Sequence, residues 1–103
     1  MNQKEAEIGN LVKKFERLVK CHLTKVPYPS NADYQEAVQR AFLKKHKEIE
    51  SEIRELEERM IRAKQSPLKQ VAASNKLRQS RWQTAISRLE EQDAEGYAIL
   101  LCL

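Results

Sequence analysis

Residues 63–68, Ala-Lys-Gln-Ser-Pro-Leu, decide how this chain folds. Serine followed by proline is a helix start signal, because the serine side chain caps the first turn and proline fits the first helical position. The residues before this step belong to a long segment of helical periodicity, so one helix ends and the next begins with scarcely any loop. A connection this short predicts two adjacent antiparallel helices, that is, a helical hairpin.

The two helices of this hairpin are expected at residues 32–64 and 67–95. The apolar stripe of the first is broad at its start and narrow toward its end, and its members are Tyr34, Val38, Ala41, Phe42, Ile49, Ile53, Leu56, Met60 and Ala63. The stripe of the second consists of Leu68, Val71, Ala72, Trp82, Ala85, Ile86 and Leu89. Asn75 and Gln79 interrupt it. A narrow stripe fits one partner helix, so we expect residues 48–80 to form a coiled-coil-like arm.

A further helix is expected at residues 3–24, ahead of the hairpin. Its apolar positions recur at the i, i+3, i+4, i+7 spacing, and they are Ile8, Leu11, Val12, Phe15, Leu18, Val19 and His22. Pro27 and Pro29 bias the residues before them away from helical geometry, so a loop follows. This helix is expected to pack on the hairpin far from the Ser-Pro step. The predicted fold is therefore all-α: one domain, residues 1–103, built as a three-helix bundle with a long antiparallel hairpin.

Charge is distributed unevenly along the expected hairpin. The segment 48–58 holds six glutamates and one arginine. Folding the chain at its Ser-Pro step places this segment beside the basic segment 74–84, and it places the acidic segment 90–95 next to Arg40 and Lys44. Each exposed pair contributes little stability, but a slipped register would bring like charges together. We therefore read these charges as pairing the two helices, and a nucleic-acid surface on the second helix as the less favoured alternative.

Motifs for catalysis and for cofactor or metal binding are missing from the sequence. No Gly-rich phosphate loop occurs, and the two histidines and two cysteines lack the spacing of metal ligands. We expect no enzyme, no cofactor, no metal and no small-molecule substrate. No run of about 18 apolar residues is present, so no membrane partner is expected. Cysteines so far apart are best read as reduced, which fits an intracellular protein, cytoplasmic or nuclear.

The function expected from this pattern is that of a non-enzymatic helical interaction module: an adaptor, an assembly subunit or a small regulator. Apolar helix stripes dock helices of other chains, and an exposed apolar tail marks an interface. The candidate interface residues are Ile49, Ile53, Leu56, Met60, Tyr97, Ile99, Leu100, Leu101 and Leu103. We expect a homodimer or an obligate protein partner; a chain that continues beyond the tail is the alternative.

Nucleic acid is the other partner class that the sequence leaves open. Two clusters of basic residues are expected on exposed helix faces, and their members are Lys13, Lys14, Arg17, Lys20, Lys44, Lys45 and Lys47. Such clusters contact phosphates without reading bases. No aromatic residue is expected among them to stack on unpaired bases, so the substrate would be duplex RNA or DNA, bound independently of sequence. The net charge of +4 is compatible with this alternative.

Overall fold

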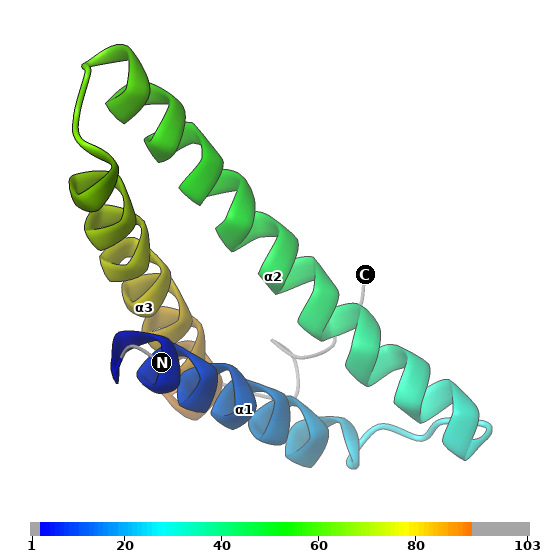
Figure 1. Cartoon of the computed structure of the whole chain (residues 1–103). Coiled ribbons are helices and arrows are strands. Elements are labelled where there is room, and N and C mark those ends of the chain that lie inside the picture. Colours follow the sequence, from blue (N-terminus) through cyan, green and yellow to red (C-terminus); the bar gives the residue numbers. More distant parts are fainter. Residues whose placement is uncertain (1–2, 92–103) are drawn as a thin grey trace.

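The computed structural model describes residues 3–91, which form three α-helices (Figure 1). Helix α1 spans Gln3–Leu23, α2 spans Asn31–Arg62 and α3 spans Pro67–Glu91. Within this range no strand occurs, and the predicted all-α, three-helix architecture is confirmed. The predicted helix limits agree with the observed ones to within two residues, apart from the expected end at residue 95, which lies outside the described residues.

The connection between α1 and α2 ends in a well-formed cap. Ser30 has extended backbone angles (φ −150°, ψ 164°), and its Oγ accepts a hydrogen bond from the Asp33 backbone N–H at 3.2 Å. The same hydroxyl donates to Asp33 Oδ2 at 2.9 Å. A serine cap satisfies a donor that the helix leaves unpaired, and an acidic residue in the first turn is favoured by the helix dipole. The start of α2 is therefore fixed by local sequence.

The connection between α2 and α3 combines a helix stop with a helix start. Lys64 adopts a left-handed conformation (φ 58°). The Lys64 and Gln65 backbone N–H groups donate to the carbonyls of Ile61 and Met60, each at 2.9 Å. This is the Schellman pattern of paired hydrogen bonds that closes a helix. Ser66 Oγ then accepts from the Lys69 N–H at 3.3 Å, which makes it the cap of α3, as its sequence predicted.

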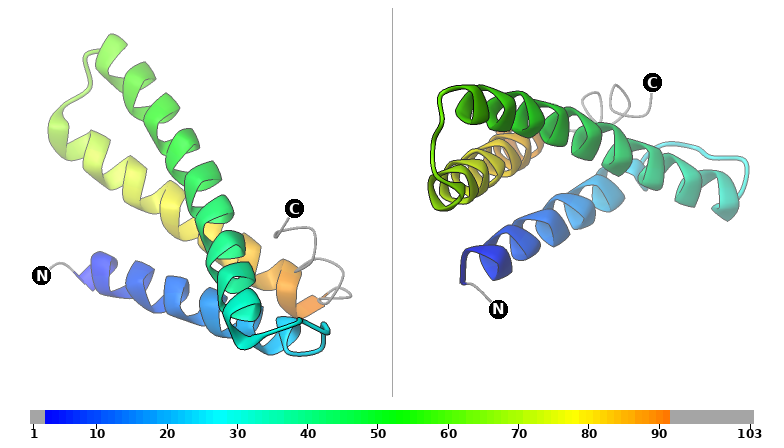
Figure 2. Two further views of the ribbon diagram at one scale, coloured as in Figure 1. Left: turned by 90° about the vertical axis from the view of Figure 1, so that its right-hand side faces the viewer. Right: turned by 45° about the horizontal axis from the view of Figure 1, so that its top comes forward.

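The bundle core is built where the three helices meet. Helix α1 lies beside α3 and packs more extensively on α3 than on α2, while α2 crosses the pair at an angle (Figure 2). Trp82 is 1% exposed at the centre of this core. Its ring makes an edge contact with Phe15 of α1 at 5.2 Å between centroids and stacks on Phe42 of α2 at 5.9 Å. The buried apolar side chains around it are Ile8, Val19, Leu23, Ala37, Val38, Ala41, Ile49, Ile53, Ala85, Ile86 and Leu89.

The end of the hairpin differs from the predicted coiled-coil-like arm. Leu68 is 83% exposed and Val71 is 57% exposed, and Ala72 is exposed as well. In the left view of Figure 2, α2 and α3 stand apart beside their connection and come together farther from it. Leu68, Val71 and Ala72, which the sequence places on the apolar stripe of the second hairpin helix, are therefore left largely uncovered. Helix spacing placed these residues on a shared face, but α2 and α3 diverge toward their connection, so that face does not close there.

Removal of the central ring tests this core. Trp82→Ala should lower the free energy of unfolding by about 3 to 5 kcal/mol, because the lost side chain leaves a cavity among three helices. Leu43→Ala is the matched control: Leu43 is a large apolar residue on the exposed side of α2, and its truncation should cost less than about 0.5 kcal/mol. Urea unfolding followed by circular dichroism measures both. Equal costs for the two variants would show that Trp82 is not the centre of the core.

Candidate functional site

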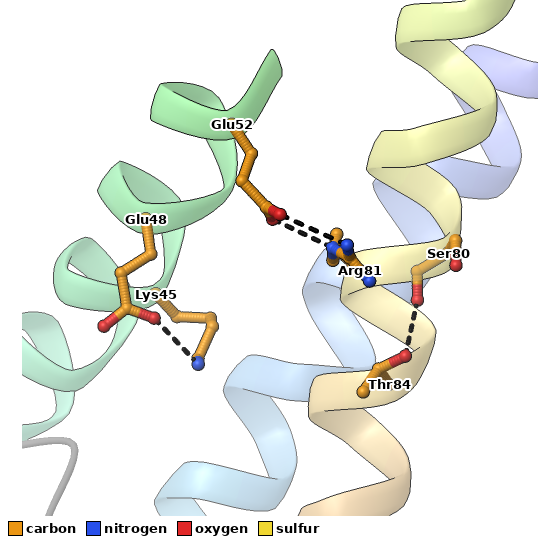
Figure 3. A network of polar contacts seen from close by, with 6 residues as sticks. All are labelled: Lys45, Glu48, Glu52, Ser80, Arg81 and Thr84. Carbon is orange, nitrogen blue, oxygen red and sulfur yellow. Dashed lines mark hydrogen bonds and ion pairs between the residues drawn. The ribbon is translucent and has the colours of Figure 1, made fainter. Parts of the chain in front are cut away.

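Two ion pairs join α2 to α3. The guanidinium of Arg78 donates to both carboxylate oxygens of Glu50, at 2.8 and 2.9 Å, and its third nitrogen donates to Asn75 Oδ1 at 3.1 Å. Arg81 makes a similar two-bond contact with Glu52, at 2.8 and 3.2 Å (Figure 3). A two-bond contact of this kind fixes the geometry more tightly than a single hydrogen bond. The predicted position of the acidic segment 48–58 beside the basic segment 74–84 is confirmed.

The Glu50–Arg78 pair is half-buried, and the pairing changes the acidity of both groups. The hydrogen bond from Arg78 lowers the pKa of the Glu50 carboxyl from its ordinary value, against the opposing effect of burial. The hydrogen bond to Glu50 raises the pKa of the Arg78 guanidinium. Both groups therefore stay charged in the folded protein at neutral pH, and the pair holds the middle of the hairpin together.

The predicted pairing of the last acidic segment with α2 is not found at Glu90, although residues 92–95 of that segment lie outside the described residues. Glu90 forms an ion pair with Lys14 of α1, at 3.3 Å. Arg40 instead pairs with Glu36, one turn away on its own helix, at 2.9 Å. The physical reason is that α1 lies alongside α3 at this end, so α1 is closer to Glu90 than the outer face of α2 is. The rest of segment 90–95 lies beyond the described residues after Glu91.

The predicted interface residues fall into three groups. Ile49 and Ile53 are buried in the core, so their assignment to an accessible interface is wrong: Trp82 and its neighbours already cover them. Leu56 and Met60 are half-buried. The tail positions Tyr97, Ile99, Leu100, Leu101 and Leu103 lie outside the described residues.

The hairpin tip, which we define as residues 54–72, carries three of the four large apolar side chains that are exposed in the described residues. Its apolar members are Leu56, Met60, Ile61, Leu68 and Val71, of which the last three are exposed. Leu68 and Val71 precede Asn75 and Trp82 at helical spacing, so they continue the face of α3 that packs on α1. Helix α1 does not reach them, because its first turns lie at the level of Gln79, whose amide donates to Glu7 at 3.5 Å. Among residues 3–91, the tip is therefore a surface of two helices that no third helix covers.

The basic clusters are brought together only in part. Lys13, Arg17 and Lys20 are exposed on α1 and have no ion pair among the described residues. Two shallow hollows on the surface share Gln39 and Leu43, and one is lined by Lys20 while the other is lined by Lys44 and Lys47.

Acidic residues reduce the charge of this basic surface. Lys14 and Lys45 are neutralised by Glu90 and Glu48, at 3.3 and 3.0 Å. Glu16 and Glu36 line the same two hollows. The predicted proximity of the two clusters therefore holds for Lys20, Lys44 and Lys47, on a surface of mixed charge.

The remaining sequence candidates form no chemical site in the described part of the chain. His46 lies against Phe42, with 5.9 Å between ring centroids, and serves as an extension of the aromatic core. Cys21 is a free, exposed thiol. Among residues 3–91, no three His, Cys, Asp or Glu side chains come close enough to hold a metal ion. None of the three described helices is sufficiently long and apolar to span a bilayer.

Sequence reasoning missed the aromatic contact of His46 and the buried position of Ser74. The Ser74 hydroxyl is buried without a hydrogen-bond partner in the described residues. Ser74 lies one helical turn before Leu77 and two turns before Arg81, a spacing that places it on the side of α3 that faces α2. The prediction followed the apolar stripe instead, which contains Val71 and Ala72.

Acid should weaken the Glu50–Arg78 pair. Because the folded-state pKa of Glu50 is lowered, the pair stabilises the fold fully above the ordinary glutamate pKa, and this contribution is lost as pH falls through the lowered value. Glu50→Gln should therefore cost about 1 kcal/mol at pH 7 and nothing once the carboxyl of the wild type is protonated. Urea unfolding across pH 2–7 measures the difference. Glu55 is exposed and has no ion pair among residues 3–91, so Glu55→Gln should show no such trend. Equal trends in the two variants would contradict the role of the Glu50–Arg78 pair.

The comparisons with known proteins add no assignment. The sequence matches no protein-family model, and neither a curated protein nor a solved structure is significantly similar to it.

Proposed function

We propose that this chain is a non-enzymatic protein-interaction module, and that it docks an amphipathic helix of a protein partner on the hairpin tip. One observation carries the proposal: the exposed apolar face of Leu68 and Val71 continues the track along which α1 packs on α3. Over the rest of α3 this track is covered by α1, and at the tip it is open. Exposed apolar patches of this kind mark interaction sites.

The shape of the surface favours a helix as the occupant. Leu56 and Met60 lie one turn apart on α2, and Leu68 and Val71 lie one turn apart on α3, so each pair shares a face of its helix. An apolar helix face with side chains at i, i+3, i+4 and i+7 fits between two such rows. Full burial of a leucine or valine side chain is worth about 1.5 to 3 kcal/mol, so a few such contacts can hold a helix in place.

A designed peptide tests this docking without knowledge of the natural partner. The probe is a stapled amphipathic helix of about 14 residues, or four turns, with leucines on one face and glutamates on its flanks. It should bind the wild-type chain, and Leu68→Ser/Val71→Ser should weaken binding at least about tenfold, because roughly 1.4 kcal/mol or more of apolar burial is lost. Fluorescence anisotropy measures the affinity.

Two controls make the result specific to the tip. Leu43→Ser removes an exposed leucine from the outer face of α2 and should leave peptide affinity unchanged. A peptide with serine in place of leucine should not bind. Unchanged affinity in the Leu68→Ser/Val71→Ser variant would contradict the proposed docking surface.

A second candidate function rests on the exposed basic face of α1. Lys13, Arg17 and Lys20 have no ion pair in the described residues, and this favours contact with the phosphates of duplex RNA or DNA. It remains the weaker proposal, because Lys14 and Lys45 already pair with acids and two glutamates border the neighbouring hollows.

A gel shift tests this second function. Duplex RNA should be retarded by the wild-type chain at low salt and released as salt rises, because bound phosphates release counterions. Reversal of Lys13, Arg17 and Lys20 to glutamate should abolish the shift. Reversal of Lys69 and Lys76 on α3 is the control, since it also lowers the net charge but spares α1. An equal loss of RNA retardation in both variants would show that net charge, and not the basic face of α1, causes the binding.

A further inference from the structure

Ser66 stands at the connection between α2 and α3 and begins the sequence Ser-Pro-Leu-Lys, residues 66–69. It is the only serine or threonine of the chain that is followed by a proline. Its Oγ accepts a hydrogen bond from the Lys69 N–H at 3.3 Å, and the residue is otherwise exposed to solvent. An exposed hydroxyl between two helices is open to an enzyme that modifies it.

We propose that Ser66 is a phosphorylation site for a proline-directed protein kinase that also selects a base three residues after the serine. A proline at the next position has a fixed φ and no backbone N–H, so it suits a kinase that offers an apolar pocket and no hydrogen-bond acceptor there. The Lys69 side chain supplies the positive charge, because kinases recognise their substrates by such charge patterns. The inference concerns the covalent state of the chain and does not depend on the helix docking proposed above.

The reaction transfers the γ-phosphoryl group of ATP to the Ser66 hydroxyl. The bond between Oγ and phosphorus forms as the bond from the γ-phosphorus to the oxygen of the β-phosphate breaks, and ADP leaves. The catalytic aspartate of the kinase takes the hydroxyl proton, and Mg²⁺ ions held by the kinase neutralise the phosphate charge. This chain supplies the acceptor hydroxyl and the residues on either side of it.

The first turn of α3 opens at small cost, and a kinase requires this because it binds its substrate as an extended strand. Pro67, Leu68 and Lys69 are all exposed, and Leu68 keeps 83% of its surface in solvent. Opening the turn breaks the hydrogen bond to Ser66 Oγ and the one from the Gln70 N–H to the Ser66 carbonyl, at 3.3 and 3.0 Å. No apolar side chain of residues 66–69 leaves the core. Helix ends of this kind open at free energies far below that of global unfolding.

Ser30 offers a comparison within the same chain. It is also an exposed helix cap, and its Oγ accepts a hydrogen bond from the Asp33 N–H at 3.2 Å. Asn31 follows it in place of proline, and Asp33 stands three residues on, where Ser66 has Lys69. The Ser30 hydroxyl also donates to the Asp33 carboxylate at 2.9 Å. The two caps therefore share their backbone role and differ in the features that the kinase recognises.

The surroundings of Ser66 also accept the charge of a phosphate. Arg62, Lys64 and Lys69 are exposed within four residues of it, and none of them forms an ion pair among residues 3–91. The chain has no acidic residue between positions 59 and 89. A phosphoserine adds about two negative charges, and placement at a helix N-terminus beside bases favours such a group. The fold therefore does not oppose the product.

Incubation of the full chain with a purified cyclin-dependent kinase, ATP and Mg²⁺ tests the proposal. Tandem mass spectrometry should place one phosphate on Ser66 and none on Ser30, and Ser66→Ala should remove it. Pro67→Ala and Lys69→Gln should each lower kcat/KM of phosphorylation by at least about tenfold, since each removes one recognised feature. Lys76→Gln removes an exposed base elsewhere on α3 and should leave the rate unchanged. Circular dichroism checks that each variant keeps its helices.

A synthetic peptide of residues 60–75 separates recognition of the sequence from accessibility in the fold. The kinase should phosphorylate this peptide, and the folded chain should react within about tenfold of the peptide's rate, because the first turn of α3 opens readily. A peptide that reacts beside a chain that does not would show that the fold hides Ser66, and this would overturn the inference. Failure of both substrates, phosphate on other residues alone, or equal rates for Lys69→Gln and Lys76→Gln would overturn it as well.

Discussion

The packing of Trp82 between Phe15 and Phe42 is the contact on which the rest of the structure depends. One ring from each helix meets at this point, and Trp82 is shielded almost completely from water. Aromatic rings in edge and stacked contact bury large apolar areas at defined angles, so they fix how helices cross as well as holding them together. Because α1 carries Phe15 near its middle, this contact also sets how far α1 extends along α3.

The reach of α1 explains why the two ends of the molecule differ. Where α1 covers α3, the apolar face of α3 is buried and its C-terminal charge, Glu90, is paired with Lys14. Beyond the first turn of α1 the same face continues without cover, and Leu68 and Val71 are exposed. One helix therefore divides the hairpin into a stable body and an uncovered tip. This division separates the residues that maintain the fold from those that are free to bind a partner.

The polar contacts follow the same division. Glu50–Arg78–Asn75 forms a half-buried polar group at the border between body and tip, and Glu52–Arg81 reinforces it on the body side. A buried or half-buried polar group tolerates few alternative registers, because a shifted helix would leave it without partners. Past this border α3 carries only basic charges, whereas α2 carries three arginines beside three glutamates.

The sequence by itself determined the local features: three helices, their limits, the Ser30 and Ser66 caps, and the opposition of acidic and basic segments in the hairpin. Each of these depends on neighbours within a few residues or on a hairpin whose register the Ser66-Pro67 step defines. Only the tertiary structure decided which apolar faces are covered. Ile49 and Ile53 matched the pattern of an interface and are buried, whereas Leu68 and Val71 matched the pattern of a core and are exposed. Periodicity identifies the face of a helix, but burial depends on whether another helix reaches that face. Here the reach of α1 and the separation of α2 from α3 settled the question.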